Sequence, residues 1–349
     1  MKALSLDPRI IGMARALKLN SDDPVLSILA FCRQRITTML RSAASIQTIW
    51  DFEKIVCAQL NMVIHEIWNE DELRGFSETY ARVEGDPKFA ALGMELEASD
   101  TFGVLYQRNA LNETGEFQYV AFVDCRGDKK LKRFFTRWHE IAHCLTSYEQ
   151  FEFPFRRTNA ADIEKDSVEK LMDMIAGDLG FLEPLFRPVL NGELGNGNLT
   201  FDTVESVRGR FCPDASFQAT LNACVTHADA PIVLVEAGLG LKRSQKRALR
   251  DGQLQLLPTQ PPRPCLRVLR SISNGAARRS GLLVHKNWRV PEYSVIAKVF
   301  NSDSEIGGEA IENLSSWKSS DGSSLKYVNV LIQARKIRER VFAIINLDE

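Results

Sequence analysis

The sequence predicts an α+β protein, and three observations support that fold class. Residues 8–62 carry apolar side chains at spacings of three and four, the pattern of amphipathic helices. Shorter β-like runs follow at 62–68, 102–108 and 118–125. From residue 265 onward the apolar pattern favours strands again. A helical N-terminal region and a β-rich C-terminal region together indicate the α+β class.

The front of the chain is expected to be helical and then to form a hairpin. Asp22 or Asp23, directly before Pro24, is a reasonable helix start. Residues 109–116, "NALNETGE", lie between two strand-like runs and look like a hairpin loop. We expect helices at about 130–146 and at 166–181 to follow.

The second half of the chain contains two candidate linkers, at 191–198 and 258–264. Between them, residues 201–211 and 217–228 are predicted to form two helices across a short turn. After the second linker the strand-like runs are "CLRVLRSIS", "YSVIAKVF", "LKYVNVLIQ" and "RVFAIINL". We therefore predict four parts: an N-terminal helical segment (1–60), a central core (61–190), a helix-turn-helix-like pair (199–240) and a β-rich C-terminal domain (262–349).

Composition restricts the class of protein. The chain has 349 residues, of which 44% are apolar and 26% charged, the ordinary profile of a globular protein. A net charge of −1 gives no general attraction to nucleic acid or anionic membranes, so such binding would need a local patch. The seven cysteines form no CxxC pair, and no apolar run resembles a signal peptide or could span a bilayer. We therefore expect a cytoplasmic protein with no membrane partner.

The stretch "RWHEIAHCLTS", residues 137–147, places a glutamate after the first of two histidines that are four positions apart. On a helix His139 and His143 differ by roughly 40° around the axis, so both imidazoles can point at one ion. Zinc accepts such nitrogen ligands and lowers the pKa of a bound water to about 7. Glu140, at the edge of the same face, is placed to act as the general base. The alternative is a helix that carries two histidines without a metal.

A catalytic zinc site needs a third protein ligand, and several carboxylates follow the motif. Glu169 follows His143 far enough along the chain to allow a loop and a returning helix. Asp173, four residues later, could accept a hydrogen bond from the second ring nitrogen of a ligand histidine. Small residues at Ala176 and Gly180 continue that face, as close helix packing would need. The alternative role for Glu169 is a capping box with Asp166. The other candidates are Glu149, Glu152, Asp162, Glu164 and Asp166.

At this point the sequence resembles the ImmA/IrrE metallopeptidases. The resemblance is carried by "YVAFVDCRGDKKLKRFFTRWHEIAHCLTS" and "EKDSVEKLMDMIAGDLGFLEP" and covers roughly residues 100–235. The family pattern is a strand, a helix with His-Glu-x-x-His, and a helix with Glu-x-x-Ala-(Asn/Asp)-x-(Phe)-Ala. Glu169, Asp173 and Ala176 match the second helix motif, whereas Met172 and Ile175 depart from it.

The resemblance implies a small zincin-like metallopeptidase core, with zinc held by His139, His143 and Glu169 and with Glu140 as general base. It also implies a zinc-dependent endopeptidase with a regulatory role, which cleaves a repressor or other regulatory protein of mobile elements or of the stress response. Some relatives carry a GAF-like sensor domain at the C-terminus, and the strand-rich tail is compatible with one.

The helix pair at 201–228 occupies the place where relatives have a helix-turn-helix. From Phe211 to Leu241, however, there is no lysine or arginine to contact DNA phosphates. We expect a structural or substrate-docking role for the pair, and nucleic-acid binding that is weak if present and comes from the basic stretch 241–250. Two alternatives stay open: a catalytically silent zincin-fold regulatory or binding protein, which could contact nucleic acid through 241–250, and a hydrolase of a small amide.

Overall fold

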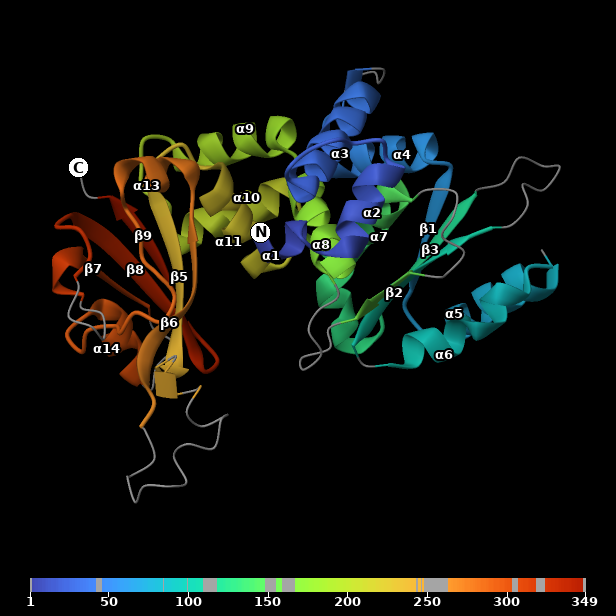
Figure 1. Ribbon diagram of the computed structural model, residues 1–349. Helices are drawn as coiled ribbons and strands as arrows, with labels where there is room; N and C mark the ends of the chain where they lie inside the picture. Colours follow the sequence, from blue (N-terminus) through green and yellow to red (C-terminus); the bar gives the residue numbers. More distant parts are fainter. Residues whose placement is uncertain are drawn as a thin grey trace. The chain divides into compact units, whose positions relative to one another are not determined.

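The computed structural model confirms the α+β class, since helices accompany two separate β-sheets (Figure 1). The chain forms two compact units: unit 1 comprises Met1–Phe186 and Arg210–Ala219, and unit 2 comprises Arg187–Gly209 and Thr220–Glu349. The structure describes residues 2–41, 46–83, 85–98, 100–108, 118–147, 155–158, 167–242, 244–245, 247, 263–302, 307–317 and 324–347.

Unit 1 begins with helices, as the apolar spacing of residues 8–62 predicts. They are α1 (Lys2–Ser5), α2 (Pro8–Ala16), α3 (Pro24–Arg41) and α4 (Ile49–Gln59). Local side chains stabilise their first turns: Asp7 accepts a hydrogen bond from a backbone amide of α2, and Thr48 and Asp51 form a reciprocal capping box at α4. α3 begins at Pro24, where the sequence predicts a helix start.

The sheet of unit 1 has the strand order β1-β3-β2-β4. Its strands are β1 (Met62–Ile67), β2 (Thr101–Gln107), β3 (Tyr119–Asp124) and β4 (Phe155–Thr158). β1 is parallel to β3, whereas β2 is antiparallel to both β3 and β4. The three predicted strands are confirmed to within one residue at each end, and β4 was not predicted. The predicted hairpin loop at 109–116 lies outside the described residues.

Successive side chains of a strand point to opposite faces of a sheet, and unit 1 covers both faces with helices. On one face Val104 and Phe122 share an apolar core with the helices between β1 and β2, which the sequence did not predict. These helices are α5 (Glu70–Glu78), the π-helical η1 (Thr79–Val83), the 3-10 helix η2 (Pro87–Ala91) and α6 (Leu92–Glu97). On the other face Gly103 lies against α7 (Arg133–Thr146), the helix of the histidine motif.

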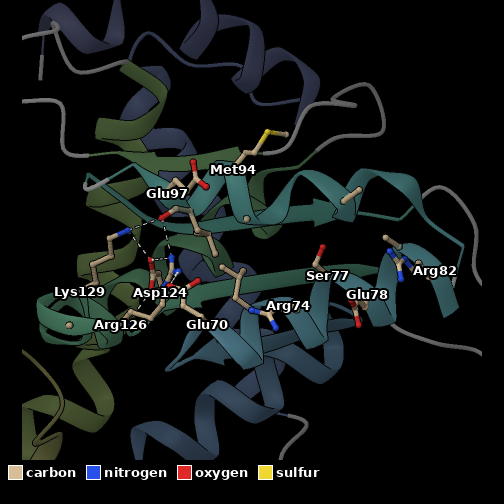
Figure 2. Close-up of a pocket in the computed structure, with 16 residues that line it drawn as sticks. Glu70, Arg74, Ser77, Glu78, Arg82, Met94, Glu97, Asp124, Arg126 and Lys129 are labelled. Carbon is tan, nitrogen blue, oxygen red and sulfur yellow. Dashed lines mark hydrogen bonds and ion pairs between the residues drawn. The ribbon is translucent and has the colours of Figure 1, made fainter.

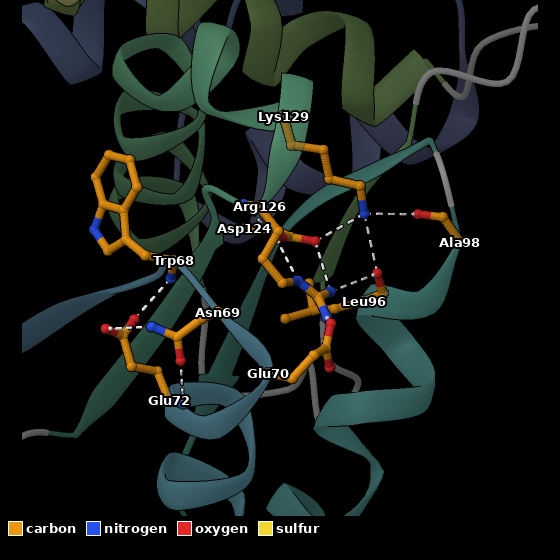
Figure 3. Close-up of polar contacts among 9 residues, drawn as sticks. All are labelled: Trp68, Asn69, Glu70, Glu72, Leu96, Ala98, Asp124, Arg126 and Lys129. Carbon is orange, nitrogen blue, oxygen red and sulfur yellow. Dashed lines mark hydrogen bonds and ion pairs between the residues drawn. The ribbon is translucent and has the colours of Figure 1, made fainter.

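A buried carboxylate fixes the chain at the end of β3, just before α7 (Figure 3). Asp124 is 1% exposed and accepts hydrogen bonds of 2.8 Å from the side chains of Arg126 and Lys129. Burial alone would raise the pKa of Asp124, but these hydrogen bonds outweigh it and lower the pKa below its ordinary value. Arg126 and Lys129 also donate to the Leu96 carbonyl on α6, so the segment leading into α7 is anchored to α6.

Unit 2 contains an antiparallel sheet with the order β6-β5-β9-β8-β7. Its strands are β5 (Ile232–Gly240), β6 (Cys265–Ser273), β7 (Gly308–Asn313), β8 (Asn329–Ile337) and β9 (Arg340–Leu347). The predicted strands at 265–273 and 340–347 are confirmed, and the one at 325–333 begins four residues too early. Between β6 and β7 the chain forms α13 (Gly275–Ser280) and α14 (Val295–Asn301), which share a core with the sheet. The short 3-10 helix η5 (Leu314–Ser316) follows β7.

The predicted strand "YSVIAKVF", at 293–300, is wrong, because this segment forms α14. Val295, Ile296 and Val299 are buried, which is the spacing that one face of a helix presents to a core. Ser294 caps the helix by accepting a hydrogen bond from the Ile296 amide. The β-branched residues favour a strand locally, but burial of this face against the sheet outweighs that preference.

The predicted helix pair is present as α10 (Phe201–Phe211) and α11 (Phe217–His227), which follow α8 (Ser167–Gly180) and α9 (Glu183–Leu194) in the chain. In unit 2 the start of α10 is tied to the sheet, because the Phe201 amide donates to the Gln333 side chain on β8 at 2.7 Å. Residues 199–240 do not form a part of their own, since 232–240 is β5, an inner strand of the sheet of unit 2.

The basic stretch 241–250 is described only in part: Arg243, Lys246 and Arg250 lie outside the described residues. Its possible contact with nucleic acid therefore stays a prediction. Among the helices that the structure describes, none combines the length and the apolar character that crossing a bilayer requires.

Candidate metal centre

α7 carries the His-Glu-x-x-His motif and is buried along most of its length. The sequence predicts a helix from about residue 130, whereas the structure has a 3-10 helix, η3 (Gly127–Lys132), before α7 begins at Arg133. Trp138 stacks on Phe52 of α4 with ring centroids 5.3 Å apart. α8 approaches α7 closely, since a Cβ added at Gly180 would lie 3.0 Å from Trp138. The small residue at Gly180 therefore permits the close helix packing that the sequence predicts.

Three side chains from α7 and α8 converge. His139 Nε2 lies 3.1 Å from His143 Nε2 and 3.0 Å from Glu169 Oε2, and His143 Nε2 lies 3.4 Å from Glu169 Oε1. Both histidines are buried, at 1% and 2% exposure. Their ligand atoms all lie within 4.8 Å of one another, so this group could hold a metal ion. Among the described residues, this is the group of three or more potential metal ligands that lie close enough to share one ion.

Asp173 determines which nitrogen of His139 carries the proton. Its Oδ1 lies 3.1 Å from His139 Nδ1, and an ionised carboxylate can only accept a hydrogen bond. His139 Nδ1 is therefore the donor, and in the neutral ring Nε2 keeps its lone pair. That lone pair faces the Glu169 carboxylate and the second imidazole. His139 Nε2 and the Glu169 carboxylate are then two acceptors that face one another in a buried space, which suits a cation between them, so the group fits a metal ion.

The protonation of the group also suits metal binding. Burial lowers the pKa of His143 below its ordinary value, which favours the neutral imidazole. Burial alone would raise the pKa of Glu169, but the close approach of the His139 and His143 side chains outweighs it and holds the pKa well below its ordinary range. A neutral imidazole and an ionised carboxylate are the forms in which these side chains bind metals.

The structure brings Glu169 to the two histidines, as the first interpretation of the sequence expects. Asp166, its partner in the alternative capping box, lies outside the described residues, as do Glu149, Glu152, Asp162 and Glu164. Asp173 lies one helical turn after Glu169 on α8, so one helix supplies both carboxylates of the group.

Glu140 is completely buried and lies against β2. A Cβ added at Gly103 would lie 2.7 Å from Glu140 Oε1 and 2.6 Å from Thr136 Cγ2, closer than real Cβ atoms approach. Gly103 is therefore required for the carboxylate to occupy this position. Sequence reasoning missed it, although a glycine inside an apolar strand is a known sign of close approach by another element.

In Gly103→Ala the new methyl group would meet Thr136 and the Glu140 carboxylate, and the three atoms nearest to it belong to none of His139, His143 and Glu169. We therefore expect a reaction that needs Glu140 to slow by about 10²-fold while metal binding is retained. The measurement is turnover together with metal content. Gly177→Ala on α8 is the matched control, since its added Cβ would meet Phe135 at an ordinary 3.9 Å. Equal turnover in the two variants would contradict the role given to Gly103.

A buried ion-pair network also holds α7, and sequence reasoning missed it. Arg137 donates to Glu53 of α4 at 2.9 Å and to Glu66 of β1 at 2.7 Å. Glu53 is 3% exposed, so this guanidinium compensates a carboxylate that has little contact with water. The network ties the helix of the histidine motif to both a neighbouring helix and the sheet. Nothing in the spacing of these residues along the chain indicates that they meet.

A hollow of about 990 Å³ lies on the α5–α6 side of the sheet of unit 1 (Figure 2). Equal numbers of charged side chains of each sign line it: Glu70, Glu78, Glu97 and Asp124 against Arg74, Arg82, Arg126 and Lys129. This balance selects neither an anion nor a cation, and two of the cations are already paired with Asp124. None of His139, His143 and Glu169 lines the hollow, which is therefore separate from the candidate metal centre.

Comparisons with known proteins do not identify a family. A scan against protein-family models and a search of curated proteins both find no match to this chain. The functional interpretation therefore depends on the residues and their geometry.

Proposed function

We propose that this protein is a zinc metallopeptidase, a hydrolase that cleaves a peptide bond in a repressor or other regulatory protein. The observation that carries the proposal is the convergence of His139, His143 and Glu169, with Glu140 buried on the same helix as the histidines. The resemblance of these motifs to the ImmA/IrrE metallopeptidases supports the same reaction and suggests the regulatory class of substrate.

Zinc is the metal that this donor set favours. Two imidazole nitrogens and one carboxylate are typical of catalytic zinc sites, whereas calcium and magnesium prefer oxygen ligands. Three protein ligands leave a fourth position open, as a catalytic zinc requires. A bound zinc supplies a Lewis acid that polarises the scissile carbonyl and lowers the pKa of water to about 7.

The side chains of this protein supply the remaining steps. Asp173 orients the His139 ring and fixes its tautomer. Glu140 acts as general base: it takes a proton from the attacking water and delivers it to the leaving amine. Its burial against Gly103 removes it from bulk water, which strengthens its electrostatic interaction with the reacting groups.

We also infer that the protein acts in the cytoplasm. All seven cysteines are free thiols, which suits a reducing compartment.

Burial raises the pKa of Cys144, the neighbour of His143, so this thiol stays protonated and is a poor nucleophile.

Metal analysis tests the zinc part of the proposal. The protein, purified without chelators, is expected to contain about one zinc per chain by elemental analysis, because three protein ligands and a buried site favour tight binding. His143→Ala should lose it. A protein without metal that regains none on addition of zinc would contradict the proposal.

A search for cleaved proteins tests the hydrolase part. New protein N-termini are compared between cells that express the parent chain and cells that express Glu140→Gln. We expect one or a few proteins, regulators of transcription among them, to be cleaved only with the parent. Identical sets of N-termini, with zinc bound in both proteins, would favour the catalytically silent alternative.

A further inference from the structure

A second hollow, of about 820 Å³, lies in unit 2 beside β6. β6 is an outer strand of the sheet, next to β5 (Figure 1). The rest of the lining comes from other elements: Glu236 on β5, Arg278 on α13, residues 283–286 after α13, and Arg340 at the start of β9. We call this hollow the β6 pocket. It contains no residue of the proposed metal centre, so its function is a separate question.

Cationic side chains outnumber carboxylates around the β6 pocket. Arg270, Arg278, Lys286 and Arg340 line it, together with a single carboxylate, Glu236. Glu236 is 6% exposed, forms an ion pair with Arg340 and lies opposite Arg270 in the register of β5 and β6. Within the described part of the chain, Arg270, Arg278 and Lys286 form no ion pair. With four cations and one carboxylate in its lining, the pocket has an excess of three positive side chains.

This excess of positive charge is local. The whole chain is nearly neutral, with 44 lysine and arginine residues against 45 aspartate and glutamate residues. Arg289, close to the pocket in sequence, pairs with Glu292 at 2.7 Å. The hollow of unit 1 has balanced charges. An excess of cations around one concave site raises the local concentration of anions there.

We propose that the β6 pocket binds a small organic phosphate. Arginine side chains form paired hydrogen bonds with phosphate oxygens, and Arg270 and Arg278 supply two such groups. Lys286 adds a third positive charge, and Ser273 supplies a hydroxyl group on the same strand as Arg270. The cations therefore match a ligand that carries one or more phosphate groups.

The rest of the lining indicates the other part of the ligand. Leu269, Leu283 and Val284 form an apolar portion of the wall, which suits an apolar or aromatic group joined to the phosphate. The volume falls in the range of small-molecule sites, roughly 300–1,000 Å³. Nucleic-acid backbones offer the same phosphate chemistry, but grooves that follow single strands usually add aromatic platforms, and the described lining contains no Phe, Tyr or Trp. A small molecule is therefore the better match.

Isothermal titration calorimetry with ATP and with inorganic pyrophosphate tests the proposal, at about 0.15 M salt so that distant surface charges are screened. We expect one saturable site per chain for ATP and weaker binding of pyrophosphate, which lacks a group for the apolar wall. Arg278→Glu should weaken ATP binding at least about tenfold, since it reverses a charge in the pocket. Arg270→Glu should have a similar effect.

Arg279→Glu is the matched control. Arg279 is the neighbour of Arg278 on α13 and is also exposed, but it does not line the pocket. Its substitution by glutamate changes the net charge of the protein by the same amount. ATP and pyrophosphate can also chelate a bound metal ion, but that would affect Arg278→Glu and Arg279→Glu alike. Absence of saturable ATP binding, or equal weakening by Arg278→Glu and Arg279→Glu, would overturn the proposal. So would a DNA duplex of about 20 base pairs that binds more tightly than ATP and depends on Arg278. None of these results depends on the proposed hydrolysis.

Discussion

Glu140→Gln should keep zinc bound and reduce hydrolysis of a verified substrate by about 10²–10⁴-fold, the usual contribution of a general base. The substitution preserves the size of the side chain and removes only its ability to accept a proton. Because Glu140 is completely buried against Gly103, an isosteric amide should fit the same space. The measurement is zinc content and turnover of the same preparation.

Glu169→Gln should also lose activity, but through weaker zinc binding and not through loss of the general base. The substitution replaces an anionic oxygen, 3.0 Å from His139 Nε2, with a neutral amide that binds metals poorly. Zinc affinity should fall, and excess zinc should restore part of the activity. The contrast between the two glutamates therefore separates proton transfer from metal binding.

Asp173→Asn should have a smaller effect than either glutamate substitution. Asp173 contacts His139 and not the metal position, so its loss should cost about 10–100-fold in metal affinity or activity. The mechanism is wrong if Glu140→Gln hydrolyses the substrate as fast as the parent protein. Unchanged zinc binding in Glu169→Gln would instead assign the third ligand to another carboxylate.

Arg137→Met should destabilise the protein by about 3–5 kcal/mol, because it leaves the carboxylate of Glu53 buried without its cation. Methionine retains much of the apolar stem, so the loss is mainly electrostatic. The measurement is the free energy of unfolding in urea, followed by circular dichroism, with the slope of the transition checked for each variant.

Arg33→Met is the matched control. Arg33 also pairs with a carboxylate, Asp178, but its side chain is 59% exposed, against 16% for Arg137. Water and salt screen such a pair, so we expect a loss of about 1 kcal/mol or less. The double variant Glu53→Gln/Arg137→Met should be more stable than Arg137→Met alone, since it also removes the stranded charge. Equal losses for the Arg137 and Arg33 variants would show that the buried network contributes no more than a surface pair.

Much of the fold could be read from local patterns. The spacing of apolar residues predicts the N-terminal helices, and the β-like runs predict β1, β2 and β3 to within one residue at each end. Where the sequence failed, at 293–300, a β-branched run favours a strand locally, and burial against the sheet of unit 2 makes it α14 instead. Local preference is weaker than the burial of an apolar face in a core.

The sequence by itself determined the parts of the candidate metal centre that depend on helical periodicity. His139 and His143 share a face because they are four residues apart on one helix, and Glu169 and Asp173 share a face of the next helix for the same reason. The tertiary structure decided that these two faces meet, which proton position His139 adopts, and that Gly103 makes room for Glu140. Contacts between segments distant in sequence depend on how the whole core packs, so the spacing of neighbouring residues does not predict them.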